Sequence, residues 1–203
     1  MSNLTRRAAF IGVAVSLSGC TAITSLNAAS RPLDTYDLSP VIGARGGAKS
    51  SQTLLVALPQ ATAALATDRI MIKPDAVSIT YLPDARWSDE LPVAVQNLLV
   101  RSISATDRVA YVGAVGAGPV PDKALLMRID AFEVIVLPDG TFQATGDFDL
   151  TLINDRDESV VASRGFAQSV NIENDTPAAV VMAFQQLLND MLPAMVDWTI
   201  ERV

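Results

Sequence analysis

Residues 138–152 read PDGTFQATGDFDLTL, and this stretch indicates the class of the fold. Its first three residues, Pro138 to Gly140, have the chemistry of a tight turn. Apolar and polar side chains then alternate, with the apolar or small ones at even positions: Phe142, Ala144, Gly146, Phe148, Leu150 and Leu152. The odd positions carry Gln143, Thr145, Asp147, Asp149 and Thr151. One buried face and one wet face are typical of a strand in an antiparallel sheet.

Further strands are expected on both sides of this stretch. Residues 123–137 before the turn are apolar on both faces, and Glu133 interrupts one of them, which predicts a β-bulge or burial on two sides. Apolar, β-prone segments that are bounded by turn residues predict the other strands. These segments are 35–38, 52–58, 69–72, 77–82, 109–112 and 160–172.

Two segments have helical periodicity. The first runs to about Ala105, with Ser88 or Asp89 as the expected cap and apolar residues spaced by three and four. The second follows Asp175 or Thr176, has a proline at its first position, and contains Pro193, which is predicted to kink or split it. The order of strands and helices predicts an α+β fold, with a mostly antiparallel sheet and two helices packed on one face.

Residues 1–20 have the pattern of a bacterial lipoprotein signal. Arg6 and Arg7 precede an apolar run over residues 8–17, which is shorter than the about 20 residues needed to span a bilayer. Leu17-Ser18-Gly19-Cys20 follows, and Cys20 is the only cysteine in the chain. The pattern predicts a cleaved signal peptide over residues 1–19 and a diacylglycerol on the Cys20 thiol. The alternative for a lone cysteine is a small core residue.

The rest of the chain is predicted to be a lipidated tether over residues 20–34 and a folded domain over residues 35–203. The tether is rich in small and polar residues, and when extended it reaches roughly 45 Å. Attachment to the membrane is expected to rest on the acyl chains, in which each buried methylene contributes about 0.8 kcal/mol.

Composition argues against several classes of function. The chain has 15 basic and 22 acidic residues, and loss of Arg6 and Arg7 with the signal changes its net charge from −7 to −9. An acidic chain without a basic run is a poor partner for nucleic acid. The chain has no histidine, which excludes Ser-His-Asp catalysis and histidine-based metal sites. We therefore predict no catalytic residues, no metal, no cofactor and no enzymatic activity. The alternative is an enzyme that uses carboxylates, and the absence of histidine and of catalytic motifs argues against it.

A few polar and aromatic residues could form a site. Asp155, Asp157 and Glu158 lack the spacing of a calcium loop and are better explained as a solvated turn. Asp147 and Asp149 lie on the wet face of one strand, where they are candidates for contact with a partner. Trp87 is a candidate for the same contact; the alternative is that its ring fills the gap between helix and sheet.

The order of these pieces resembles the ABC-type transport auxiliary lipoprotein family, of the paraquat-inducible protein C type. The resemblance rests on Tyr36-Asp37-Leu38 after the lipobox, Asp68-Arg69-Ile70, a strand ending at Tyr81, Ala85-Arg86-Trp87-Ser88 with Leu91-Pro92, and Trp198. It covers about residues 33–200. Pro193 inside the last helix departs from the family pattern. The family has no catalytic residues to transfer, so Cys20 is the one site that the resemblance supports.

The resemblance implies a lipid-anchored, periplasm-facing protein of the cell envelope. It implies an outer-membrane location, and Thr21 after the cysteine agrees with this, because lipoprotein families use aspartate there for retention in the inner membrane. The implied partners are an ABC permease, its ATPase and an MCE-domain protein, in a system that moves lipids or other hydrophobic molecules; a homo-oligomer remains open. The alternative is a lipid- or solute-binding lipoprotein that acts without a transporter.

Overall fold

The computed structural model describes residues 32–41, 46–116 and 118–203. The chain from Leu33 to Val203 forms one compact unit with one hydrophobic core. The predicted signal peptide, Cys20 and the tether as far as residue 31 lie outside the described residues.

The described residues form nine strands and two helices. In chain order these are β1 (Asp34–Tyr36), β2 (Thr53–Val56), β3 (Gln60–Ala61), β4 (Arg69–Lys73), β5 (Thr80–Trp87), α2 (Leu91–Ser104), β6 (Tyr111–Ala114), β7 (Lys123–Val136), β8 (Phe142–Asn154), β9 (Val160–Ile172) and α3 (Pro177–Ile200). The predicted α+β class is confirmed. β3 was not expected, because two residues are too few to show a period.

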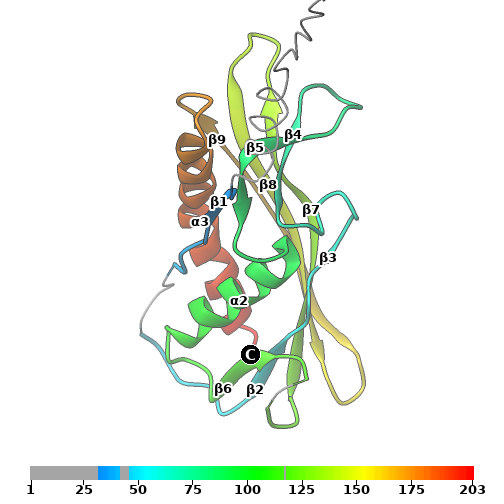
Figure 1. Ribbon diagram of the computed structural model, residues 1–203. Coiled ribbons are helices and arrows are strands. Elements are labelled where there is room, and N and C mark those ends of the chain that lie inside the picture. The colour runs from blue at the N-terminus through cyan, green and yellow to red at the C-terminus, as the bar shows by residue number, and fades with distance from the viewer. Residues whose placement is uncertain (1–31, 42–45, 117) are drawn as a thin grey trace, which may run out of the picture. The chain divides into compact units, whose positions relative to one another are not determined.

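All nine strands belong to one sheet, which is mixed (Figure 1). β8 pairs antiparallel with β7 on one side and β9 on the other. The other edge of β7 pairs in succession with β2, β3 and β4, and all three run parallel to it. The prediction of a mostly antiparallel sheet is therefore wrong. The parallel pairs arise because the chain returns to the sheet through a crossover that contains α2, and such a crossover leaves no local signal in a strand.

The alternating pattern of β8 is confirmed, and it explains the irregularity of β7. Each even-numbered side chain from Ala144 to Leu152 is buried in the core. In β7 the side chains that point into the core are at odd positions as far as Ile129 and at even positions from Phe132. The change occurs because the pairing with β8 shifts between Ile129 and Ala131. The predicted bulge is thus present, and it turns Glu133 away from the core face.

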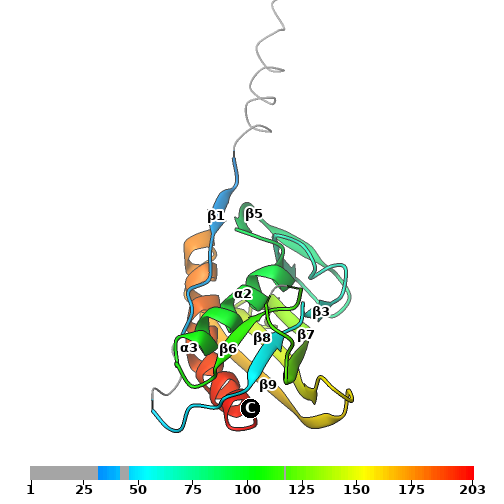
Figure 2. The same ribbon diagram turned by 90° about the horizontal axis from the view of Figure 1, so that it is seen from below.

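Both helices lie on the same side of β7, β8 and β9 (Figure 2). α3 packs on β8 and β9, α2 packs on β2 and β6, and the two helices contact each other. By length and composition α3 could cross a membrane, but more than half of its side chains are buried, as in the core helix of a folded body.

The two helix starts differ from each other in how they are capped. α3 begins at Pro177 as predicted, and the Thr176 hydroxyl accepts a hydrogen bond from the Ala179 N–H at 3.3 Å. α2 has Glu90 at its N-cap without a side-chain hydrogen bond, so the prediction of a cap at Ser88 or Asp89 is wrong. Pro193 does not divide α3, which continues as one helix to Ile200.

At Gly146 side chains of α3 pack closely against the backbone of β8. A Cβ atom at this position would lie 2.9 Å from Leu187 Cδ2 and 3.2 Å from Phe148 Cε2. We expect Gly146→Val to lower the free energy of unfolding by about 1–3 kcal/mol, because a larger side chain overpacks the core. Urea denaturation followed by circular dichroism measures the change.

Gly165 on the neighbouring strand β9 provides the control for this substitution. No atom lies within 4 Å of a Cβ built at this position. Gly165→Val should leave stability unchanged or raise it, since valine favours strands. Equal losses from both variants would contradict the close packing of α3 on Gly146.

Candidate functional site

Several of the residues that carry the family resemblance meet around β1, at the start of the folded body. We call residues 33–39 the lead-in segment. Its strand β1 runs parallel to β5, with Asp34 opposite Ala85 and Tyr36 opposite Trp87. β1 is the edge strand of the sheet at this end, and β5 is its neighbour.

The second half of the lead-in segment is held by the Ser88 turn and by α2. The Ser88 N–H donates to the Tyr36 carbonyl at 2.8 Å, and the Ser88 hydroxyl donates to Asp37 Oδ1 at 3.2 Å. Arg101 of α2 donates to the Leu38 carbonyl at 3.0 Å, and the Leu38 side chain is buried in the core. Ser88 is therefore used to fix the lead-in segment, which explains why it does not cap α2.

The lead-in segment also reaches α3. The Ser39 N–H donates to Gln185 Oε1 at 2.8 Å, and Gln185 Nε2 donates back to the Ser39 carbonyl at 3.2 Å. Seven residues thus connect the start of the body to β5 and to both helices.

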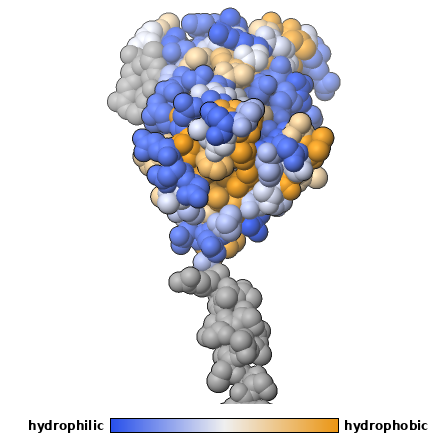
Figure 3. All heavy atoms as spheres, turned by 90° about the horizontal axis from the view of Figure 1, so that it is seen from above, coloured by the Kyte–Doolittle hydropathy of each residue, from blue (hydrophilic) through white to orange (hydrophobic). Residues whose placement is uncertain are grey.

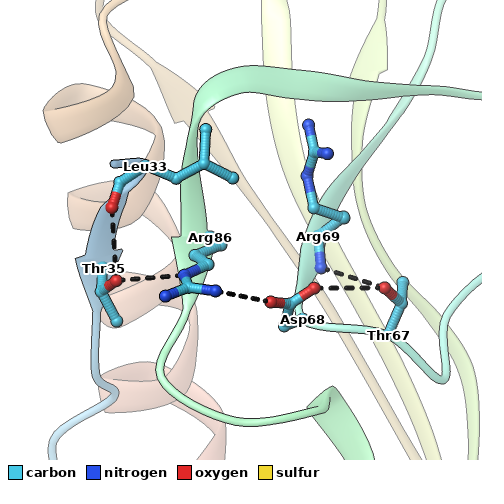
Figure 4. A network of polar contacts seen from close by, with 6 residues as sticks. All are labelled: Leu33, Thr35, Thr67, Asp68, Arg69 and Arg86. Carbon is cyan, nitrogen blue, oxygen red and sulfur yellow. Dashed lines mark hydrogen bonds and ion pairs between the residues drawn. The ribbon is translucent and has the colours of Figure 1, made fainter. Parts of the chain in front are cut away.

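Arg86 links the lead-in segment to the start of β4 (Figure 4). Its Nε donates to Thr35 Oγ1 at 3.2 Å, and its Nη1 lies 3.5 Å from Asp68 Oδ2. Thr35 Oγ1 in turn donates to the Leu33 carbonyl at 3.4 Å, and Thr67 Oγ1 donates to Asp68 Oδ1 at 3.5 Å. The side chains of Arg86 and Asp68 are both partly exposed, so this network orients the junction more than it stabilises it.

Trp87 lies in the core and not on a surface. Its side chain is 2% exposed, and its ring centroid is 5.5 Å from that of Phe184 and 5.9 Å from that of Phe132. The prediction that Trp87 contacts a partner is therefore not supported by its position. The alternative holds: the ring fills the space between the sheet and α3.

Asp147 and Asp149 lie on the opposite face of the sheet from Trp87. They flank Phe148, which points into the core, so their own side chains point to the other face. Asp149 Oδ2 is 4.0 Å from Arg128 Nη2, and Asp130, Asp149 and Asp147 together raise the pKa of Arg128, with Asp130 as the main cause. The three predicted contact residues thus do not form one surface.

The wet face around these two aspartates is lined by hydrogen-bonded pairs that connect β8 with β9. Gln143 pairs with Asn171 at 2.8 Å, and Thr145 pairs with Ser169 at 3.0 Å. Thr151 forms a further pair with Ser163 at 2.8 Å. On β9 the residues opposite the two aspartates are Ala167 and Gly165, whereas on β7 Arg128 lies opposite Asp149.

Sequence reasoning missed an ion pair beneath this face. Lys73 Nζ lies 2.8 Å from Glu133 Oε1, and the Glu133 side chain is 4% exposed. The two residues are 60 positions apart in the chain, and β4 meets β7 only through a parallel pairing that no local pattern reveals. The one signal in the sequence was the charged residue that interrupts an apolar strand.

The described residues form one folded unit with a mixed sheet, two helices and an N-terminal segment that is held by hydrogen bonds. This architecture is that of a small α+β protein. The chain matches the model of the ABC-type transport auxiliary lipoprotein component over residues 36–196. The match spans most of the chain, and the protein belongs to this family. The family is described as an auxiliary lipoprotein component of ABC-type transport.

Two solved structures share the fold. A DUF330 family protein from Xanthomonas campestris is 25% identical, with a TM-score of 0.77, over 83% of this chain and 95% of that one. An uncharacterized protein is 16% identical, with a TM-score of 0.61, over 84% of this chain and 99% of that one. The first supports the family assignment, and the second shows the fold alone.

A longer relative also matches in sequence. An uncharacterized protein of Bradyrhizobium diazoefficiens is 28% identical over 173 residues, which cover 82% of this chain and 44% of the relative. The chain thus spans less than half the length of that curated relative.

Proposed function

We propose that the protein is the membrane-anchored auxiliary subunit of an ABC transport system that contains an MCE-domain protein and moves lipids or other hydrophobic molecules. In this proposal the acyl chains on Cys20 hold it to the periplasmic face of the outer membrane. Family membership supports the role as an auxiliary component. The observation that carries the anchored arrangement is the lead-in segment, which is bonded to β5, α2 and α3.

The contact surface for the partner is proposed to be the wet face of β8 and β9. This face is continuous, since the pairs between β8 and β9 extend over most of both strands. Within the described residues β9 pairs with β8 alone, so its other edge offers unpaired backbone groups to a partner strand. Asp147 and Asp149 supply charge that a basic surface would recognise. Trp87 is not part of this surface, because its side chain is buried in the core.

A double charge reversal tests this surface. Asp147→Lys with Asp149→Lys should leave the fold intact, because both side chains are partly exposed and Arg128 keeps Asp130, its main partner, at 2.7 Å. Co-purification with the MCE-domain protein should fall by about tenfold or more, because attraction between opposite charges becomes repulsion. The measurement is quantitative mass spectrometry after affinity purification at low salt.

Charge reversal at Glu173, an exposed acid beyond the last residue of β9, is the control and should leave co-purification unchanged. If the Asp147/Asp149 variant folds and co-purifies as well as wild type, the docking site lies elsewhere, and the exposed sides of the helices become the next candidate.

A further inference from the structure

Glu133 is a buried acid with an incomplete set of partners. Its Oε1 accepts from Lys73 at 2.8 Å, whereas its Oε2 is buried and has no hydrogen-bond partner among the described residues. A buried carboxylate oxygen without a donor is costly, and such groups in folded proteins are nearly always bonded to protein, water or a ligand. The second oxygen therefore indicates that a donor from outside the chain belongs here.

Glu133 lines a cavity of about 510 Å³ between the β4–β5 turn and the end of β7. The polar part of its wall is formed by Lys73, Asp75 and Glu133, and the apolar part includes Ile135, Leu137 and Pro138. The volume exceeds what one water molecule needs several-fold. The charged groups sum to one negative charge, which favours a ligand that carries a cation.

Asp75 stays ionised at the mouth of this cavity. Its Oδ1 accepts from the Val77 N–H at 2.9 Å and the Ser78 N–H at 2.8 Å, and these bonds hold the pKa of Asp75 below its usual value. Lys73 is about one third exposed and has N–H donors beyond the one that faces Glu133. The cavity thus offers carboxylate acceptors together with a cationic donor.

The cavity lies at the end of the sheet from which the lead-in segment comes. β1 runs parallel to β5, and β5 starts just after the 74–79 turn, so the lead-in segment begins on the side of that turn. Val77 on the turn is 92% exposed and Ile79 is 49% exposed. Figure 3 looks onto this end of the body and shows apolar surface near its middle, with hydrophilic surface around it.

We propose that this cavity binds the phosphoethanolamine headgroup of a phospholipid. The Glu133 side chain, whose Oε2 is closed to solvent in the structure, turns toward the cavity so that Oε2 accepts from the primary ammonium, and the phosphate accepts from Lys73. The exposed Val77 and Ile79 rest against the acyl region. A choline headgroup does not fit the role, because its quaternary nitrogen has no N–H to donate. The inference rests on the membrane attachment in the proposed function, and it needs no transporter.

Two binding measurements on the mature lipidated protein test the site and its source. In detergent, O-phosphoethanolamine and phosphocholine are titrated and followed by ligand-observed NMR. In nanodiscs with equal phosphatidylglycerol and either phosphatidylethanolamine or phosphatidylcholine, the rate of acetylation of Lys73 is measured by mass spectrometry. We expect binding of O-phosphoethanolamine alone, and slower acetylation of Lys73 in the phosphatidylethanolamine discs.

Glu133→Gln keeps the shape of the side chain and replaces the acceptor Oε2 with a donor. It should weaken binding of O-phosphoethanolamine by about tenfold, as expected for loss of a charged hydrogen bond. It should also remove the difference between the two kinds of disc. Glu173→Gln, at an exposed acid, is the control and should behave as wild type, and the melting curves of both variants verify folding.

Each other outcome overturns the proposal or its membrane source. Equal results for ethanolamine and choline headgroups, or for wild type and Glu133→Gln, would show that Oε2 bonds to water only. Binding of free O-phosphoethanolamine without any effect of the discs would contradict a lipid source and assign the site to a soluble phosphoamine. No transporter takes part in these measurements. A negative result would therefore contradict the headgroup site and leave the proposed role in transport untouched.

Discussion

Cys20→Ser should abolish incorporation of radiolabelled palmitate and leave an uncleaved or unanchored chain. The thiol is the atom that carries the diacylglycerol in the predicted lipoprotein, and a serine hydroxyl does not replace it. Acyl chains supply the binding to the bilayer, at about 0.8 kcal/mol for each buried methylene. Loss of the chains therefore removes the attachment as a whole.

The measurement combines labelling with membrane fractionation. Wild type should be labelled and should sediment with the outer membrane, and Thr21→Ser, which leaves the cysteine intact, is the matched control. Equal labelling of wild type and Cys20→Ser would contradict the lipoprotein assignment. Recovery of wild type with inner-membrane vesicles alone would contradict the predicted sorting.

Trp87→Ala should lower the free energy of unfolding by about 3–5 kcal/mol, the usual cost of truncating a large core aromatic. The ring is 2% exposed and packs edge-on against Phe184 at 5.5 Å between centroids. Its loss would open a cavity between β5, β7 and α3. Chemical denaturation followed by circular dichroism measures the change.

Trp87→Phe is the control for this experiment, because it keeps an aromatic ring at the same place and should retain most of the stability. An unchanged denaturation curve for Trp87→Ala, together with weaker binding to a partner, would contradict burial of the ring and support contact with the partner.

The parts of the fold that could be predicted are those with a local pattern. The alternation in β8 and the change of phase in β7 both follow from side chains that lie close together in the sequence, and so does the Pro177 start of α3. The order of strands in the sheet could not be predicted, because β2, β3 and β4 meet β7 through long-range parallel pairing.

The same distinction applies to the candidate sites. Asp147 and Asp149 were placed on the wet face because the period of a strand decides the direction of a side chain. Trp87 is a candidate for a surface role by sequence because its neighbours Arg86 and Ser88 are polar, with burial between helix and sheet as the alternative. The structure shows that those neighbours serve the lead-in segment, through Thr35 and Asp37. The ion pair between Lys73 and Glu133 could not be predicted from the sequence, because it depends on the pairing of β4 with β7.

Affinity purification of the mature protein from its native membranes is the most direct test of the proposed role. The eluate in mild detergent is compared by quantitative mass spectrometry with that of Cys20→Ser. An ABC permease, its ATPase and an MCE-domain protein should be enriched with wild type and reduced with the unanchored variant. Absence of any transport component from the wild-type eluate, with the lipidated protein intact, would contradict the account. It would favour a lipid- or solute-binding lipoprotein that acts without a transporter.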